Sequence, residues 1–261
     1  DRIYFVGVND NEKTQFEGLW PLPFGVSYNS YLVVDEKVAL VDTVEAGFEE
    51  EFLANINEAI GDRAIDYLIV NHMEPDHSSL ISYMLSTYPG LKIIANAKTL
   101  PMLKGYHGVE ADKVHVVAEG ETVSLGNSTL RFHMIPMVHW PETMVTYLDE
   151  EATVFSGDAF GTFGAVNENV LDEEDTFEQY SDEMMRYYSN IVGKYGVPVQ
   201  AALKKLSGVR IDRICSTHGP VWEKNIAKVI ALYDKMSRYD VERGVCIVYG
   251  SMYGNTAAAA D

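Results

Sequence analysis

The residues best suited to chemistry directly follow a short apolar segment, 65–70, whose β-branched and aromatic composition is typical of a buried strand. They are four potential metal ligands within six residues: His72, Glu74, Asp76 and His77. Ligands spaced so closely cannot all reach one ion, but a kinked loop can divide them between two adjacent ions. Pro75 supplies a kink, because it fixes its own φ and favours an extended conformation at Glu74. The cluster therefore predicts a two-metal site at the end of a strand.

A solvated polar loop that begins a helix is the alternative interpretation of this cluster. Signals for the start of a helix account for Asp76 and Ser78 in that interpretation. They do not account for two histidines in the same loop.

Three more potential ligands lie where other apolar segments end. His139 occupies a proline-flanked loop, whereas Asp158 and His218 each follow directly on an apolar, strand-like segment. A glycine follows soon after Asp158 and after His218, and glycine is typical of loops. The side chains of Asp158 and His218 can therefore lie at one edge of a sheet. The set now holds seven candidate ligands, which include four of the chain's seven histidines. Histidines that only pack in a hydrophobic core are not expected to recur at the ends of strands in this way.

Several other polar residues have two interpretations or a structural one. Asp42 ends an apolar segment and either supports the site from behind or forms a turn. Tyr187 or Tyr188 either lies over the metals as a hydrogen-bond donor or belongs to an aromatic core stripe. His115 and His133 lie inside strand patterns without carboxylate neighbours, and we expect them to be structural.

Four imidazoles and three carboxylates form a ligand set of nitrogen and oxygen without thiolate. Such oxygen-rich ligation stabilises ferric as well as ferrous iron, and the three carboxylates leave two ferrous ions with a formal charge of about +1. A redox-active iron pair is therefore favoured. Zinc stays open as the alternative metal, because imidazole and carboxylate also suit zinc, which would activate a water for hydrolysis.

Composition narrows the classes of protein that fit. The chain has 261 residues, of which 47% are hydrophobic, enough for one large α/β domain or one domain and part of another. Its formal net charge of -19 disfavours nucleic-acid and anionic-membrane partners. It shows neither a long apolar run nor a secretory leader, so we expect a cytoplasmic protein. Its only cysteines, Cys215 and Cys246, exclude a disulfide framework.

Apolar periodicity alternates between strand and helix patterns along the chain, which is typical of an α/β fold. Strand patterns occur at 3–8, 28–34, 38–42, 65–70, 91–95, 114–117, 121–135 with a turn at 126–127, 145–148, 152–157, 211–217 and 245–249. Helix patterns occur at 48–60, 79–87, 97–105, 177–195, 198–206 and 222–239. The segment 48–60 has a four-residue apolar spacing and is interpreted as a plain core helix.

The seven ligands at these wide spacings resemble the metallo-β-lactamase superfamily. Glu74, together with the stretch 139–144, is similar to the flavodiiron proteins in particular, and the resemblance extends through nearly all of residues 1–243. It implies an αββα sandwich of the metallo-β-lactamase type over that range. It also implies that His72, Glu74 and His139 hold one iron, that Asp76, His77 and His218 hold the other, and that Asp158 bridges them. In the hydrolytic zinc members a histidine usually takes the place of Glu74.

The last residues, 244–261, resemble the start of a flavodoxin-like FMN domain. After the apolar segment 245–249 comes a loop rich in hydroxyls and backbone amides, a type that cradles phosphate. The FMN-binding residues implied by the resemblance are Ser251, Met252, Tyr253, Gly254, Asn255 and Thr256. One strand cannot complete such a sheet, so we expect 245–261 to be poorly ordered or to pair with a neighbouring chain, and we expect this 261-residue chain to bind FMN weakly or not at all.

The resemblance also implies a function. Flavodiiron proteins reduce O2 to water, NO to N2O, or both, at two non-haem irons, with electrons passed through FMN from a rubredoxin-like or flavin-reductase partner. A head-to-tail homodimer is implied as well. The alternative function is that of a zinc-dependent hydrolase of the same superfamily.

Overall fold

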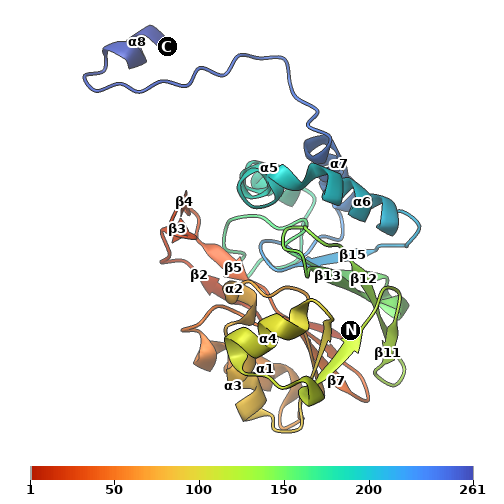
Figure 1. The fold of residues 1–261 in the computed structure, drawn as a ribbon. Coiled ribbons are helices and arrows are strands. Elements are labelled where there is room, and N and C mark those ends of the chain that lie inside the picture. The colour runs from red at the N-terminus through yellow and green to blue at the C-terminus, as the bar shows by residue number, and fades with distance from the viewer. Residues whose placement is uncertain (1, 261) are drawn as a thin grey trace.

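Two β-sheets packed face to face form the centre of the protein, which the computed structural model describes over residues 2–260 (Figure 1). The six-stranded sheet has the order β1 (Ile3–Phe5), β6 (Tyr31–Val34), β7 (Val38–Val41), β8 (Tyr67–Ile69), β9 (Lys92–Asn96), β10 (Val114–Val117). The five-stranded sheet has the order β11 (Thr122–Ser124), β12 (Thr129–Met134), β13 (Met144–Leu148), β14 (Thr153–Gly157), β15 (Arg213–Ser216).

Helices cover the outer faces of both sheets. On the side of the first sheet lie α1 (Glu49–Ile60), α3 (Ile81–Thr87) and α4 (Thr99–His107), and on the side of the second lie α5 (Thr176–Tyr187), α6 (Gly196–Leu206) and α7 (Ile226–Ser237) (Figure 1). The α1 residues Phe52, Ile56 and Ile60 are buried at four-residue spacing, as expected of a core helix. The predicted αββα sandwich of the metallo-β-lactamase type is confirmed.

Both faces of the central strands are buried, which explains why the sequence reads there as continuous apolar runs. In β7, Val38 and Leu40 belong to the cluster under the helices, whereas Ala39 and Val41 belong to the cluster between the sheets. The parallel strands β7, β8 and β9 end at the same edge of their sheet. Loops at that edge carry the polar cluster found in the sequence.

The first predicted strand, 3–8, is wrong in one respect, because it is split in two. Strand β1 pairs with β6, whereas β2 (Val8–Asp10) pairs with β5 (Val26–Tyr28) in a small separate sheet. Gly7 lies at the break, where a Cβ atom would come 2.4 Å from the carbonyl oxygen of Tyr28. A second small sheet joins β3 (Gln15–Phe16) and β4 (Trp20–Pro21).

The helix predicted from residue 79 begins earlier and is interrupted. A short helix, α2 (Pro75–Ser78), starts inside the ligand cluster with Pro75 in its first turn, and α3 follows after Leu80. Glu74, at φ -59° and ψ 140°, has the extended conformation expected before a proline. Because the backbone changes from extended to helical at Pro75, the side chain of Glu74 and those of α2 leave the chain in different directions.

Two C-terminal helices also differ from the prediction. The helix expected over 222–239 begins only at Ile226. Asp172, from a distant loop, accepts hydrogen bonds from the backbone nitrogens of Glu223 (2.7 Å) and Asn225 (2.9 Å) and so holds the residues before Ile226 outside the helix. The helix expected over 177–195 changes at Tyr188 into a π-helical turn, Tyr188–Val192.

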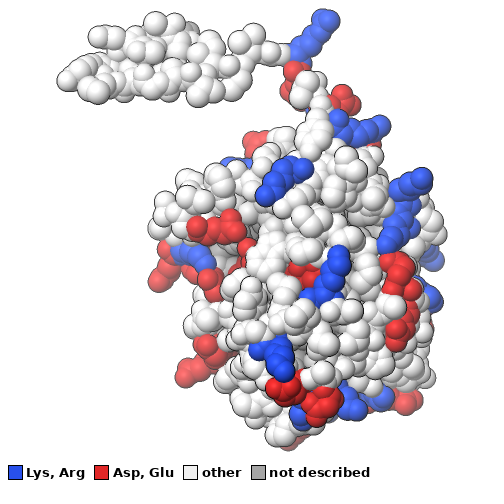
Figure 2. Space-filling view, in the orientation of Figure 1, with Lys and Arg blue, Asp and Glu red and all other residues white. Residues whose placement is uncertain are grey.

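The strand expected at 245–249 is absent from the structure over residues 2–260. Val245 and Val248 are exposed, and the segment extends away from the sandwich to a short helix, α8 (Asn255–Ala260) (Figure 1). The extended part is free of charged side chains (Figure 2). Without a neighbouring strand its backbone groups have no ladder to join. Among the described residues no helix is both long and apolar enough to cross a membrane.

Candidate metal centre

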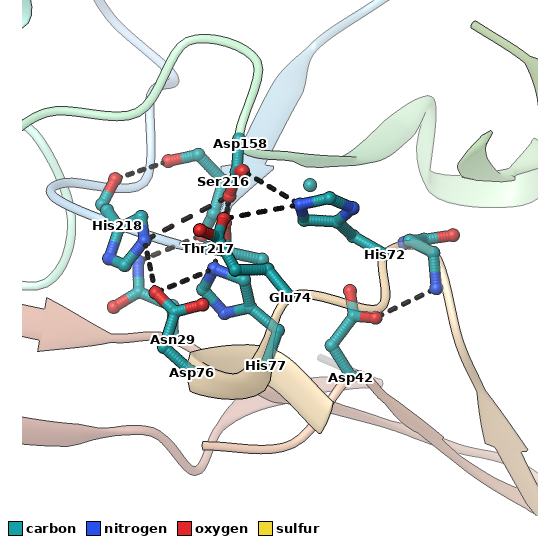
Figure 3. A network of polar contacts seen from close by, with 12 residues as sticks. Asn29, Asp42, His72, Glu74, Asp76, His77, Asp158, Ser216, Thr217 and His218 are labelled. Carbon is teal, nitrogen blue, oxygen red and sulfur yellow. Dashed lines mark hydrogen bonds and ion pairs between the residues drawn. The ribbon is translucent and has the colours of Figure 1, made fainter. Parts of the chain in front are cut away.

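All seven candidate ligands converge between the ends of the two sheets. Figure 3 labels all of them except His139. His72 and Glu74 lie between β8 and α2, Asp76 and His77 lie in α2, His139 lies in the loop before β13, Asp158 follows β14, and His218 follows β15. They form two groups in which one ligand atom from each residue lies within 4.8 Å of the others: His72, Glu74, His139 and Asp158, and then Asp76, His77 and His218.

In the first group, three side chains surround one small space. Nε2 of His139 lies 3.0 Å from Oε2 of Glu74. Nε2 of His72 lies 3.4 Å from the same oxygen and 3.3 Å from Nε2 of His139. Two imidazole nitrogens and a carboxylate oxygen facing one another in this way match a cation site.

In the second group, Asp76 stands between two histidines. Its Oδ2 lies 3.3 Å from Nε2 of His77 and 3.2 Å from Nε2 of His218. The two imidazole rings meet edge to face with their centroids 4.7 Å apart.

Asp158 lies between the two groups and offers a different oxygen to each. Its Oδ2 is 2.9 Å from Nε2 of His139 and 3.3 Å from Nε2 of His72. Its Oδ1 is 3.1 Å from Nε2 of His77, and it also accepts a hydrogen bond of 2.7 Å from the hydroxyl of Thr217. A carboxylate held in this orientation can serve two cations at once.

The second group also fits a cation because its polar atoms lack partners. Among residues 2–260, Nε2 of His77, Nε2 of His218 and both carboxylate oxygens of Asp76 are buried without a hydrogen-bond partner, and so is Oδ2 of Asp158. These atoms approach one another without the geometry of a hydrogen bond. Unpaired buried polar groups are costly, and a cation bound in the second group would satisfy those of Asp76, His77 and His218, whereas one in the first group would satisfy Oδ2 of Asp158.

Glu142 orients His72. Its Oε1 accepts hydrogen bonds from Nδ1 of His72 (2.9 Å) and from the backbone nitrogen of Met73 (3.0 Å). With the proton held on Nδ1, Nε2 of His72 carries a free lone pair that faces the site. Only 1% of the surface of Glu142 is exposed, so its hydrogen bond with His72 is shielded from water.

His218 is oriented in the same way by a backbone group. Its Nδ1 donates to the carbonyl oxygen of Ser27 at 2.7 Å, which leaves Nε2 for a cation. The amide of Asn29 holds the loop by donating to the carbonyl oxygens of Ser216 (2.9 Å) and Gly219 (2.8 Å). Gly219 has φ +76°, and a Cβ atom there would lie 2.0 Å from the hydroxyl oxygen of Thr162, so only glycine fits.

Asp42 supports the site from behind. It is buried, and its Oδ1 accepts a hydrogen bond of 2.8 Å from the backbone nitrogen of Asn71, the residue before His72 (Figure 3). Burial raises the pKa of Asp42 to about 6. Asp42 has φ +55° but lies outside a turn, so of its two sequence interpretations the structure supports the one in which it holds the site from behind.

Aromatic rings enclose His218. The rings of Phe16 and Tyr187 each lie 5.4 Å from it, and the ring of Tyr28 lies at 5.8 Å. Tyr187 therefore lies beside the candidate centre, whereas Tyr188 turns away to pack on Tyr233. Burial first, and then the carboxylates of the site, hold the pKa of Tyr187 well above its usual range, so its phenol stays protonated.

The carboxylates and imidazoles shift one another's pKa. Burial alone would lower the pKa of His77 and His139, but the neighbouring Asp158, with Asp76 or Glu74, raises both to about 9. Burial alone would raise the pKa of Asp158, but the nearby imidazoles hold it well below its usual range. Without a metal, His77 and His139 therefore remain protonated at neutral pH.

The centre is nearly closed to solvent. Glu74, Asp76 and His139 are each 7 to 8% exposed, whereas His72, Asp158 and His218 are fully buried. The β3–β4 hairpin lies beside Glu74, where partial burial and contact with Glu74 raise the pKa of Glu17.

Some features of the site and its surroundings differ from the sequence analysis. His115 and His133 lie in strands outside the site, and the structure adds a contact that the local pattern did not show: they pair with Glu121 (3.2 Å) and Glu119 (2.9 Å), which lie farther away along the chain. The sequence patterns did not predict that Glu142, Thr217 and Ser27 support the ligands. The loop proposed for FMN, residues 251–256, lies in the exposed tail, away from the centre (Figure 1).

Comparison with known proteins agrees with this geometry. Residues 26–219 match the family described as ODP family beta lactamase. The chain is 35% identical, over its whole length, to an anaerobic nitric oxide reductase flavorubredoxin of Escherichia coli O1:K1 / APEC, of which it covers 55%. It thus spans about half the length of that relative.

Solved structures show the same fold. The flavodiiron protein of Giardia intestinalis superposes with a TM-score of 0.94 at 31% identity, over 99% of this chain and 63% of that one. The rubredoxin oxygen:oxidoreductase of Desulfovibrio gigas superposes with a TM-score of 0.86 at 31% identity, over 91% of this chain and 60% of that one.

Proposed function

The chain belongs to the ODP beta-lactamase family and, within it, to the flavodiiron proteins, and from this membership we propose that it reduces O2 to water, NO to N2O, or both, at a non-haem diiron centre. The observation that carries the proposal is the position of Asp158 between two ligand groups, with one oxygen toward each. We assign His72, Glu74 and His139 to one iron and Asp76, His77 and His218 to the other. Asp158 would contribute one oxygen to each iron.

When bound, two irons would supply electrons to O2 or NO inside a pocket shielded from water. The protein's own part is to fix the ligands and to limit access. Glu142 and the carbonyl of Ser27 hold the tautomers of His72 and His218, and Thr217 holds Asp158. The protonated phenol of Tyr187 borders the same pocket.

Electron supply forms a separate part of the proposal. In the complete protein, FMN bound by the loop 251–256 would receive electrons from a rubredoxin-like or flavin-reductase donor. The names of two relatives, flavorubredoxin and rubredoxin oxygen:oxidoreductase, support a donor of this kind. We also propose the head-to-tail homodimer, which would bring one protomer's flavin toward its partner's irons.

A single-turnover experiment tests the function without the electron donor. The iron-loaded protein is reduced chemically, freed of reductant and mixed without air with NO, or separately with O2. N2O in the headspace is the expected result with NO, because two ferrous ions supply the two electrons that convert two NO to N2O and water. With O2 the same two electrons suffice only for reduction to the level of peroxide, so O2 consumption with oxidation of both irons is the expected result. A protein that consumes neither gas while it retains both irons contradicts the proposal. His139→Ala, which removes a proposed ligand, is the matched negative control.

A further inference from the structure

An apolar cleft lies beside the candidate metal centre, where β9 and β10 end. Its wall consists of the segments 96–98, 116–118 and 141–143 together with Met134 and Pro136. Its volume is about 330 Å³, at the small end of the range of roughly 300–1,000 Å³ that is usual for small-molecule sites. The cleft therefore has room for one small organic molecule.

Glu142 lies between the cleft and the centre. It belongs to the wall of the cleft, and its carboxylate accepts the hydrogen bond from Nδ1 of His72. The side chain of Glu142 is fully buried, so it presents no accessible carboxylate to the cleft. The amide of Asn96, another wall residue, donates to the carbonyl oxygen of Glu142 and ties β9 to the loop before β13. The cleft therefore adjoins the candidate centre but contains none of its seven ligands.

Most of the exposed surface of the wall is apolar. Val116 is 41% exposed, and it lies on β10, the edge strand of the six-stranded sheet. Ala97, Ala118 and Pro141 are exposed as well. Apolar surface gathered in one place is typical of interaction sites. The wall therefore favours a ligand whose body is apolar.

Lys98 brings the one charged group that the wall exposes within the described residues. Its Nζ donates a hydrogen bond of 3.1 Å to the carbonyl oxygen of Pro141, and an ammonium group has three donors, so it can bind a further acceptor. Lys98 forms no ion pair within residues 2–260, whereas Lys205, which donates to the carbonyl oxygen of Met134, is paired with Glu119. An unpaired cation beside an apolar wall is complementary to an anionic group on an apolar ligand.

We propose that this cleft binds a small organic carboxylate with an apolar body. The body would pack against Val116 and Pro141, and the carboxylate would accept a hydrogen bond from Nζ of Lys98. The formal net charge of -19 repels anions from the protein in general, so a preference for a carboxylate would have to come from Lys98. Binding is non-covalent, and the inference is independent of the metal and of the proposed function.

Three probes with the same apolar body and different charges test this inference: 2-naphthoate, 2-naphthylmethanol and 2-naphthylmethylamine. Equilibrium dialysis against the 261-residue protein measures the dissociation constant of each. We expect 2-naphthoate to bind more tightly than the neutral alcohol, by up to about fivefold as for an exposed ion pair, and the amine to bind most weakly. Unspecific adsorption to an acidic protein would favour the amine. Tightest binding of the amine, or no binding of 2-naphthoate at millimolar concentration, overturns the inference.

Lys98→Gln should abolish the preference for 2-naphthoate over the alcohol, because it removes the cation and keeps most of the side chain. Lys104→Gln is the control, since Lys104 is exposed on α4 outside the wall, and it should keep the preference. An equal preference in the two variants overturns the inference.

Ala118→Phe fills the cleft and should weaken the binding of all three probes. Ala111→Phe, at an exposed position outside the wall, should leave their binding unchanged. Metal content equal to that of the unmodified protein shows that both variants are folded. Equal binding to the two variants overturns the inference, because the probes then bind elsewhere. A dimer on gel filtration that only Ala118→Phe dissociates would also overturn it, because a second copy of the chain would then occupy the cleft.

Discussion

Nδ1 of His72 donates a hydrogen bond of 2.9 Å to Oε1 of Glu142, and both side chains are fully buried. The pair joins residues 70 positions apart in the sequence. It fixes the histidine's tautomer and makes Nε2 a better metal ligand.

Glu142→Gln tests this contact. The amide keeps the size of the side chain but loses the negative charge that favours a proton on Nδ1, so metal affinity should fall by about 10- to 100-fold. The fall should concern the ion at His72, Glu74 and His139, as measured by competition with a chelator. Glu58→Gln, an exposed change on α1, is the control. Equal affinities in the two variants would show that Glu142 does not tune the metal.

Asp158→Ala should lose both metal ions, because Asp158 contributes one oxygen to each ligand group. His218→Ala should mainly lose the ion of the second group, since Nε2 of His218 faces Asp76. Metal content per chain, measured by mass spectrometry after desalting, distinguishes the two patterns. Normal occupancy of both positions in Asp158→Ala would remove it from the bridging role. The loops around the site should also loosen in that variant, since metal binding and local order are coupled.

Metal loading should release protons. In the metal-free protein the neighbouring carboxylates raise the pKa of His77 and of His139 to about 9, so both are largely protonated at pH 7.5. A metal binds only the neutral imidazole, and about two protons should therefore leave on loading. Titration calorimetry in two buffers of different ionisation enthalpy measures this number. The release should decline as the pH rises through 9, and release of less than about one proton at pH 7.5 would contradict the assignment.

Gly219→Ala should destabilise the loop that carries His218. The backbone at residue 219 has a left-handed φ of +76°, a conformation that alanine rarely adopts. The new Cβ atom would also lie 2.0 Å from the hydroxyl oxygen of Thr162. We expect a loss of about 1–3 kcal/mol in the free energy of unfolding, measured by urea denaturation. Gly208→Ala, where a Cβ atom meets nothing within 4 Å, is the control. Equal stability of the two variants would show that the loop tolerates a side chain.

The fold and the candidate ligands could be predicted from the sequence because both depend on local patterns. The apolar runs ending at His72, Asp158 and His218 reveal buried strands and the polar residues at their ends. Strand-end residues from two sheets meet at one place once the sheets pack, so residue type and position were sufficient to bring the seven together.

The supporting contacts could not be predicted in this way, because each joins distant segments. Glu142 reaches His72 across 70 residues, and the carbonyl of Ser27 reaches His218 across 191. A backbone carbonyl carries no sequence signal at all. The late start of α7 has the same origin, since Asp172, which binds the backbone before the helix, comes from a loop about 50 residues earlier. The prediction of a strand at 245–249 was wrong for a related reason. A strand needs a neighbouring strand to pair with, and a local sequence pattern does not show whether one is present.

The identity of the bound metal tests the central claim most directly. Iron and zinc should be quantified together in protein purified from its native host without added metal. The account predicts two irons per chain and little zinc, held by the imidazoles and carboxylates around Asp158. Two zincs without iron, in protein that hydrolyses thioesters or lactams, would contradict the diiron reductase and favour the zinc-dependent hydrolase.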